Sequence, residues 1–178
     1  MDSGIAMLSA ISAGLIALIF AKAAVGKLLN FFETQGIIRD YRLLPEATVP
    51  AVTVLVIIAE LAITVSLLVP SLRSAGAIGA MAMLLAYAAS IGINLKRGRV
   101  SIDCGCGGTG QGITPWHLLR NGVYAAIAAT AALLPVEQIS GFAPAATCVL
   151  SIVMLWCGIM LFEQLLKIKA HIVVSKLR

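Results

Sequence analysis

Residues 101–121, SIDCGCGGTGQGITPWHLLRN, form a polar, glycine-rich stretch in a chain that otherwise consists of long apolar runs. Cys104 and Cys106 lie in it with one glycine between them, and the apolar run that follows is interrupted by Arg120 and Asn121. The flanking runs are too long and too continuous for alternating strands, so they predict helices. Any chemistry of this protein is therefore expected at this stretch, on a frame of helices.

The composition of the whole chain predicts a helical membrane protein. Its 178 residues are 60% hydrophobic and 12% charged, whereas soluble domains carry about 25% charged residues. The net charge of +5 does not indicate a nucleic-acid partner, because the basic residues lie at the ends of apolar runs, where they anchor helices to the membrane face. The chain is thus expected to be all-α and to span the lipid bilayer several times.

The apolar runs predict five transmembrane helices, each near the length of about 20 residues that crosses the hydrocarbon core. They are expected to form a single integral membrane domain over residues 1–178, a four-helix transmembrane bundle plus a fifth transmembrane helix. The first run lacks the basic segment that opens a signal peptide, so we interpret it as a retained helix. The predicted spans are 4–25, 48–69, 75–95, 116–134 and 142–162, with the cysteine loop at 96–115.

The basic residues also predict an orientation. Alternating spans place the first loop, the cysteine loop and the C-terminal tail on one side of the membrane. Of the 13 lysines and arginines, two lie inside spans, Arg73 lies on the opposite side, and the rest lie on the cysteine-loop side (Lys27, Arg39, Arg42, Lys96, Arg97, Arg99, Lys167, Lys169, Lys176 and Arg178). Because basic loops stay in the cytoplasm, the charge pattern places the cysteine loop on the cytoplasmic side.

The cysteine pair has three interpretations, of which a redox-active dithiol is favoured. Gly105 gives the backbone the freedom to close the very small ring of a Cys-Gly-Cys disulfide, and strained, exposed disulfides are generally oxidising. Nearby arginines and the N-terminus of the following helix favour the thiolate, which is the form that attacks. The alternatives are a soft-metal site, for which His117 is the one further soft ligand in the stretch, and a purely structural role.

Two further cysteines, Cys148 and Cys157, lie in the fifth run. Their spacing on a helix puts them about 13.5 Å apart along the axis and on opposite faces, so they cannot pair with each other. We expect them to be small apolar packing residues, as most single cysteines inside membranes are.

Polar residues inside the predicted spans form a second candidate site. Lys22, Glu60, Asn94, Arg120 and Asn121 are costly in hydrocarbon, so they are expected to face the bundle interior. A lone ionised carboxylate is too costly to stay unpaired, so Glu60 is expected to meet Lys22 or Arg120, directly or through water. The cluster is either a structural ion pair or a polar pocket beside the cysteines, for a quinone or for proton transfer.

Several of these features together resemble the methylamine utilisation protein MauE family, which is similar to DoxX-like membrane proteins. The most specific of them is DCGCG at 103–107 followed by the Arg-Asn pair at 120–121. The others are FAKAAVGKLLNF at 20–31, YRLLP at 41–45, Glu60 and the Arg-Gly pair at 97–98. The resemblance covers about residues 10–135.

The resemblance implies a multi-pass protein of the bacterial cytoplasmic membrane. In this family's role it would assist disulfide formation and maturation of the small subunit of methylamine dehydrogenase, which bears tryptophan tryptophylquinone, together with a thioredoxin-like partner of the MauD type. The redox interpretation of the cysteine pair makes Cys104 and Cys106 the catalytic residues of a thiol–disulfide oxidoreductase, and a helper protein without enzymatic turnover is the other interpretation. No metal and no certain cofactor is implied, and a quinone is the one candidate.

The resemblance leaves two alternatives open. The family is also similar to the four-helix bundles of DsbB and vitamin K epoxide reductase, but the Cys-Gly-Cys pair differs from their CxxC. A non-catalytic scaffold or DoxX-like protein with structural or metal-binding cysteines is therefore the alternative function. A periplasmic client also implies a periplasmic cysteine loop, which is opposite to the side that the charge pattern predicts.

Overall fold

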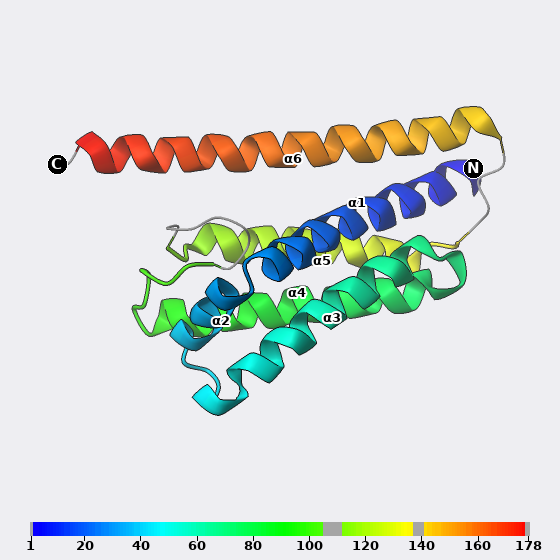
Figure 1. The fold of residues 1–178 in the computed structure, drawn as a ribbon. Coiled ribbons are helices and arrows are strands. Elements are labelled where there is room, and N and C mark those ends of the chain that lie inside the picture. The colour runs from blue at the N-terminus through cyan, green and yellow to red at the C-terminus, as the bar shows by residue number, and fades with distance from the viewer. Residues whose placement is uncertain (1, 105–111, 137–140, 177–178) are drawn as a thin grey trace.

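The computed structural model describes residues 2–104, 112–136 and 141–176, and it is all-α over these residues (Figure 1). This confirms the predicted fold class. In chain order the structure contains α1 (Asp2–Leu29), α2 (Phe31–Asp40), the 3-10 turn η1 (Glu46–Thr48), α3 (Val49–Leu68), the 3-10 turn η2 (Pro70–Leu72), α4 (Arg73–Lys96), α5 (Pro115–Leu133) and α6 (Phe142–Lys176).

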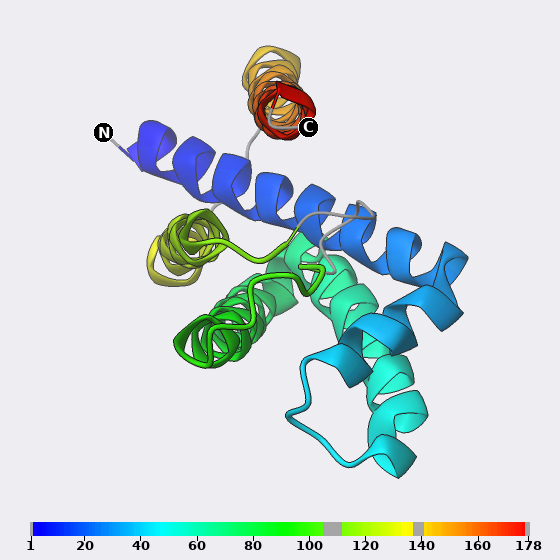
Figure 2. The ribbon, with the colours of Figure 1, turned by 90° about the vertical axis from the view of Figure 1, so that its left-hand side faces the viewer.

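Four of the helices form a closed bundle. Helix α1 packs against α3 and α5, and α4 packs against the same two helices from the other side (Figures 1 and 2). The core between them combines large side chains such as Ile16, Phe20 and Leu67 with small ones such as Ala80 and Ala128. Small side chains let the helix backbones approach closely, which is how helices associate in a membrane.

Gly76 of α4 shows how close this approach is. A Cβ added at Gly76 would lie 2.8 Å from the Cβ of Ser66 and 2.9 Å from the backbone nitrogen of Leu67. We expect Gly76→Ala to lower the free energy of unfolding by about 1–3 kcal/mol, the usual cost of overpacking, and to lower the melting temperature in detergent. Gly122→Ala is the matched control, because apart from its chain neighbours and the adjacent backbone of its own helix no described atom lies within 4 Å of the added Cβ. Equal melting temperatures would contradict close packing at Gly76.

Helix α6 lies on the flank of the bundle and packs against α1, which it crosses (Figure 2). Among the described residues, four segments are long and apolar enough to cross a membrane: Gly4–Leu29, Glu46–Leu68, Pro70–Lys96 and Phe142–Leu166. The protein is therefore a polytopic membrane protein. Helix α5 is less apolar because its first turns carry His117, Arg120 and Asn121, so its crossing of the membrane stays a prediction.

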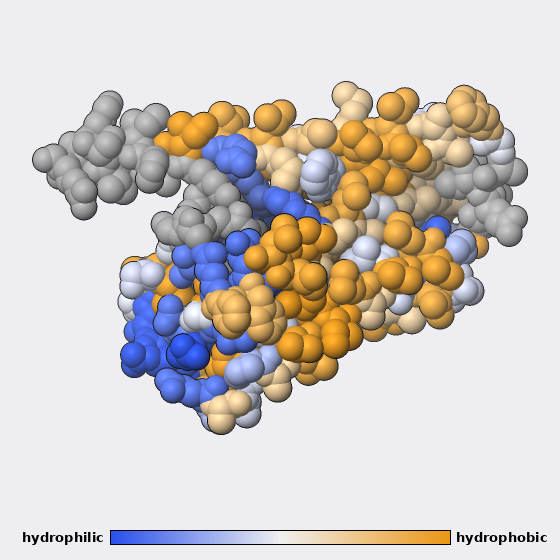
Figure 3. All heavy atoms as spheres, viewed as in Figure 1, coloured by the Kyte–Doolittle hydropathy of each residue, from blue (hydrophilic) through white to orange (hydrophobic). Residues whose placement is uncertain are grey.

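The end of the bundle next to the cysteine loop is polar. In Figure 3, hydrophilic residues gather at this end, over α2 and the adjoining ends of α3 and α4, while the bundle beyond it presents a largely apolar surface. The C-terminal end of α6 lies on the same side, and the N-terminus of α1 lies at the opposite end (Figure 1). The first loop, the described base of the cysteine loop and the C-terminal end of α6 thus lie at the same end of the bundle (Figure 1).

The base of the cysteine loop is fixed to this end of the bundle. Asp103 and Gly112 form an antiparallel β-bridge, and the backbone N–H of Ile113 donates to the carbonyl oxygen of Ile102 at 2.9 Å. Gly112 has no room for a side chain, because the carbonyl oxygen of Val100 lies where a Cβ would be. Ile102 and Ile113 belong to a small apolar cluster, and Cys104 packs against it. The bridge and the cluster therefore position Cys104.

Candidate functional site

A partly open cavity of about 510 Å³ lies between the bundle and the helices α2 and α6, in the half next to the cysteine loop. Small-molecule sites in proteins usually have about 300–1,000 Å³. Part of the wall is apolar, with side chains such as Phe20, Leu84 and Met160. Its charged and amide side chains come from α1, α2, α3, α5 and α6: Lys22, Lys27, Asn30, Glu33, Glu60, Arg120, Asn121 and Glu163. The cavity thus combines apolar and charged walls.

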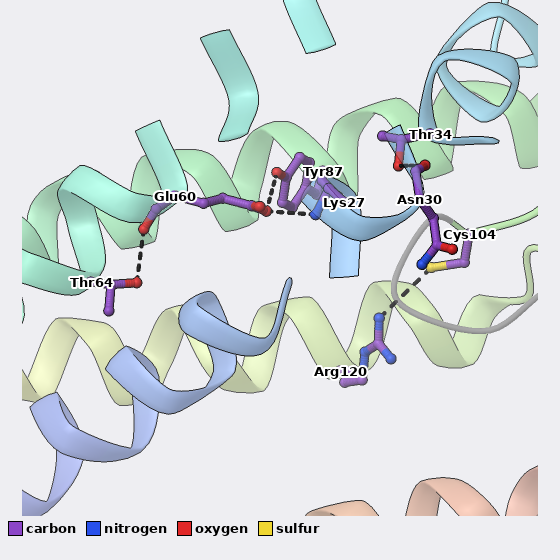
Figure 4. A network of polar contacts seen from close by, with 8 residues as sticks. All are labelled: Lys27, Asn30, Thr34, Glu60, Thr64, Tyr87, Cys104 and Arg120. Atoms are coloured by element: carbon purple, nitrogen blue, oxygen red, sulfur yellow. Dashed lines mark hydrogen bonds and ion pairs between the residues drawn. The ribbon is translucent and has the colours of Figure 1, made fainter. Parts of the chain in front are cut away.

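Glu60 of α3 is fully buried, with 0% of its surface exposed, which confirms that it faces the bundle interior. Its Oε1 accepts hydrogen bonds from Lys27 Nζ and from the Tyr87 hydroxyl, each at 2.7 Å (Figure 4). Lys27 Nζ also lies 5.6 Å from the centroid of the Tyr87 ring. The prediction that Glu60 meets Lys22 or Arg120 in a direct contact was therefore wrong, because its partners are Lys27 and Tyr87.

The geometry of α1 explains which lysine meets Glu60. Lys22 and Lys27 are five residues apart, which separates them by about 140° around a helix. Only one of them can therefore face α3. Lys27 does so, whereas Lys22 lies beside α6, with Nζ at 2.8 Å from Met160 Sδ and 3.8 Å from Glu163 Oε2.

Arg120 and Lys22 share Glu163 of α6. Arg120 Nη1 lies 3.0 Å from Glu163 Oε1, and these two side chains are only 11% and 17% exposed, against 40% for Lys22. Because solvent screens exposed pairs more than buried ones, the Arg120–Glu163 pair is the stronger of the two. The rings of Trp116 and Phe162 meet edge to face beside it, with centroids 5.6 Å apart. These contacts join α6 to α5 and α1.

Arg120 also reaches the cysteine loop. Its Nη2 lies 3.7 Å from Cys104 Sγ (Figure 4), and the Tyr41 hydroxyl donates to the Cys104 carbonyl oxygen at 3.5 Å. A guanidinium beside a sulfur stabilises the thiolate over the thiol. Cys104 is half-buried at the end of the bundle. Arg120 lines the cavity and contacts this cysteine, so it connects the two. Cys106 lies outside the described residues, and its pairing with Cys104 stays a prediction.

The cavity brings together most of the polar cluster that the sequence predicts. Lys22, Glu60, Arg120 and Asn121 line it, but Asn94 does not. Asn94 is fully buried in α4, and its Nδ2 donates to the carbonyl oxygen of Ser90 at 3.1 Å. Asn94 therefore follows the rule that polar residues in a membrane face the interior, but it lies outside the site.

The remaining candidate ligands are placed away from any joint site. The backbone N–H of Thr114 donates to His117 Nδ1 at 3.1 Å, so His117 caps the start of α5. Cys148 is buried and Cys157 exposed, as expected for opposite faces of one helix. Within the described residues, no three side chains of His, Cys, Asp or Glu converge in a way that could hold a metal ion.

Three residues of the site were missed in the sequence: Lys27, Tyr87 and Glu163. Lys27 resembles the lysines that anchor helix ends, and Tyr87 lies in an ordinary apolar run. Glu163 follows directly on the predicted fifth span, although α6 continues to Lys176. The available signal was a carboxylate at the end of one apolar run, level with the basic residues Lys22 and Arg120 in two others.

Known proteins resemble this chain over the bundle and the cysteine loop. The family model described as Methylamine utilisation protein MauE matches residues 5–135. The methylamine utilization protein MauE of Paracoccus versutus is 40% identical over 135 residues, covering 74% of this chain and 73% of the relative. That of Methylophilus methylotrophus is 37% identical over 145 residues, covering 79% and 76%. That of Paracoccus denitrificans is 39% identical over 115 residues, covering 64% and 62%.

No solved structure matches the chain. The region matched by the family model runs from α1 through α5 and contains both Cys104 and Arg120. It therefore includes the whole four-helix bundle and most of the cavity wall, while α6 lies beyond it. Because the family model covers well over half of the residues, the chain belongs to the methylamine utilisation protein MauE family.

Proposed function

We propose that this protein is a membrane thiol–disulfide redox factor in which Cys104 and Cys106 are the reactive pair. Its client is the small subunit of methylamine dehydrogenase, and it acts in the bacterial cytoplasmic membrane. The observation that carries the proposal is the 3.7 Å approach of Arg120 Nη2 to Cys104 Sγ. Disulfide exchange needs a thiolate, and a neighbouring guanidinium favours that form. The family's role in methylamine utilisation supports the choice of client.

In the proposed reaction, a client thiolate attacks the Cys104–Cys106 disulfide and forms a mixed disulfide, which a second client thiol resolves. One S–S bond breaks and one forms, so the client loses two electrons and two protons and the pair gains them as two thiols. A thioredoxin-like partner of the MauD type, in its disulfide form, then restores the Cys104–Cys106 disulfide by the same exchange and is itself reduced to two thiols. The position of Cys104 at the polar end of the bundle suits contact with a soluble partner.

A quinone would be a second route for the electrons. The cavity is large enough for a quinone head, and its wall offers both apolar surface and hydrogen-bonding groups. Arg120 lines the cavity and contacts Cys104, so a head group bound there would lie near the reactive sulfur. This acceptor stays a prediction from the sequence.

Thiol labelling tests the proposal directly. A membrane-impermeant maleimide is applied to intact cells and to inverted vesicles, before and after reduction, with Cys148 and Cys157 replaced by serine. A redox pair is expected to label only after reduction, and from one side only, which also fixes the orientation of the loop. The Cys104→Ser/Cys106→Ser double variant should not label in either case. Equal labelling of oxidised and reduced membranes would contradict a redox role.

A further inference from the structure

We infer that Glu163 of α6 is a positioning residue for the thiol site, because its carboxylate holds the Arg120 guanidinium against Cys104. This inference rests on the proposed function, since it concerns the thiolate form of Cys104, one of the two proposed reactive sulfurs. Glu163 lies beyond residues 5–135, the part of the chain that the family model matches. The C-terminal helix would therefore complete a site whose other residues lie in the bundle.

Two different nitrogens of one guanidinium make the two contacts. Arg120 Nη1 lies 3.0 Å from Glu163 Oε1, and Nη2 lies 3.7 Å from Cys104 Sγ. The guanidinium is planar and its donors form a rigid fork, so fixing Nη1 also fixes the direction of Nη2. An arginine without such an anchor keeps several rotamers, and ordering it costs entropy. Glu163 thus removes part of the cost of placing Arg120 at the sulfur.

Glu163 is itself held from two sides. Its Oε2 lies 3.8 Å from Lys22 Nζ of α1, so both carboxylate oxygens have a cationic partner. Its neighbour Phe162 packs edge to face on Trp116 of α5. This stretch of α6 is therefore tied to α1 and to α5 at the level of Arg120, although the helix otherwise lies on the flank of the bundle.

A carboxylate beside Arg120 has two opposed effects on Cys104. Its negative charge partly offsets the cation and so disfavours the thiolate, while its hydrogen bond keeps the cation in place and so favours it. A test must separate charge from position. Among the described residues, the titratable groups around this pair include Lys22, Tyr41, Asp103 and His117. The cavity wall that the pair shares adds Lys27, Glu33, Glu60, Tyr87 and Tyr124.

The test compares Glu163→Gln with Glu163→Leu in a protein whose only cysteine is Cys104. Both substitutions remove the charge and have similar size, but only glutamine can accept the hydrogen bond from Arg120 Nη1. The alkylation rate of Cys104 is measured against pH in detergent. We expect the midpoint of the Glu163→Gln profile to lie about one pH unit below that of Glu163→Leu, the smaller end of the effect of a neighbouring cation.

An Arg120→Leu background supplies the control. There the two Glu163 variants should give the same midpoint, because the cation that they position is gone. Equal midpoints with Arg120 present would overturn the inference, as would a gap that persists without it. Glu163→Ala replaces Glu163→Leu if the leucine variant does not fold. Alkylation needs no client, so its outcome does not depend on the proposed function. A gap between the midpoints together with normal client maturation in the Cys104→Ser variant would refute the proposed function and leave the inference about Glu163 standing.

Discussion

Replacing either Cys104 or Cys106 by serine is expected to reduce mature client to the level of cells that lack the protein, and the double variant is expected to be no worse. One thiol cannot close the intramolecular disulfide that the proposed exchange requires, so the pair acts as one unit and the losses are not additive. The measurement is methylamine dehydrogenase activity together with the free-thiol count of its small subunit, in cells that carry each variant.

The two cysteines of α6 provide matched controls. Cys157 is exposed and Cys148 buried on the same helix, and neither lines the cavity that Arg120 reaches. Cys157→Ser should therefore leave client maturation unchanged. A double serine variant at Cys104 and Cys106 with normal amounts of disulfide-bonded client would show that the pair is not the working element. Loss of client maturation in only one of the two single variants, Cys104→Ser or Cys106→Ser, would favour a metal-binding or mixed-disulfide role.

The helices and many of their ends could be predicted from the sequence, because local chemistry determines them. Thr114 and Pro115 are suited to the N-cap and the first position of a helix, and α5 begins there. The predicted span 75–95 lies within α4, which ends before Gly98 at a positive φ of 71°. Glycine reaches this conformation without strain. Such signals need no knowledge of the neighbouring helices.

The partners inside the bundle could not be predicted in the same way. Helical spacing gives the angle between Lys22 and Lys27 on α1, but not which neighbouring helix each of them faces. That depends on how far α1 is rotated and shifted against α3, which is decided by the fit of many side chains at once. The charge of Glu60 predicted that it has a partner, and only the packing showed that the partner is Lys27.

The sequence of helix α5 carried a signal for its buried face, which the spacing of its polar residues around the helix axis would have revealed. His117, Asn121 and Tyr124 follow the spacing of one helix face, and all three are buried. This polar stripe lies against the bundle interior, so the helix is less apolar than a span that faces lipid on most sides. For Glu163 the sequence showed only a carboxylate at the end of an apolar run, level with Lys22 and Arg120. Its contact with Arg120 could not be predicted, because it depends on how α6 packs on the flank of the bundle.

Replacing Lys27 by methionine is expected to be among the most destabilising single changes in the bundle. It leaves the fully buried Glu60 carboxylate without its cation, and breaking a buried pair on one side costs about 3–5 kcal/mol. Lys27 Nζ lies 2.7 Å from Glu60 Oε1, and the lysine side chain is only 11% exposed. The measurement is the melting temperature of each variant in detergent, with Lys22→Met as the control. The more exposed Lys22 pair should cost about 1 kcal/mol or less.

The double variant Lys27→Met/Glu60→Leu is expected to regain most of the lost stability, because it removes both charges and fills their space with apolar side chains. Such a recovery shows that Lys27 and Glu60 are energetically coupled, because the second substitution offsets the destabilisation caused by the first. The prediction would be contradicted if the melting temperature of the double variant fell by as much as the two single variants together, or by more. A wild-type melting temperature for Lys27→Met would show that Glu60 does not depend on the lysine.

Client maturation in the same double variant decides between the two interpretations of the polar cluster. A purely structural pair allows a refolded bundle without Lys27 and Glu60 to support its client at normal levels. A pocket that carries protons or binds an acceptor needs the charged wall, so the bundle would refold and maturation would still fail. Because Glu60 lines the same cavity as Arg120, which contacts Cys104, we expect refolding together with a loss of maturation. The pair would then serve the thiol chemistry as well as the fold.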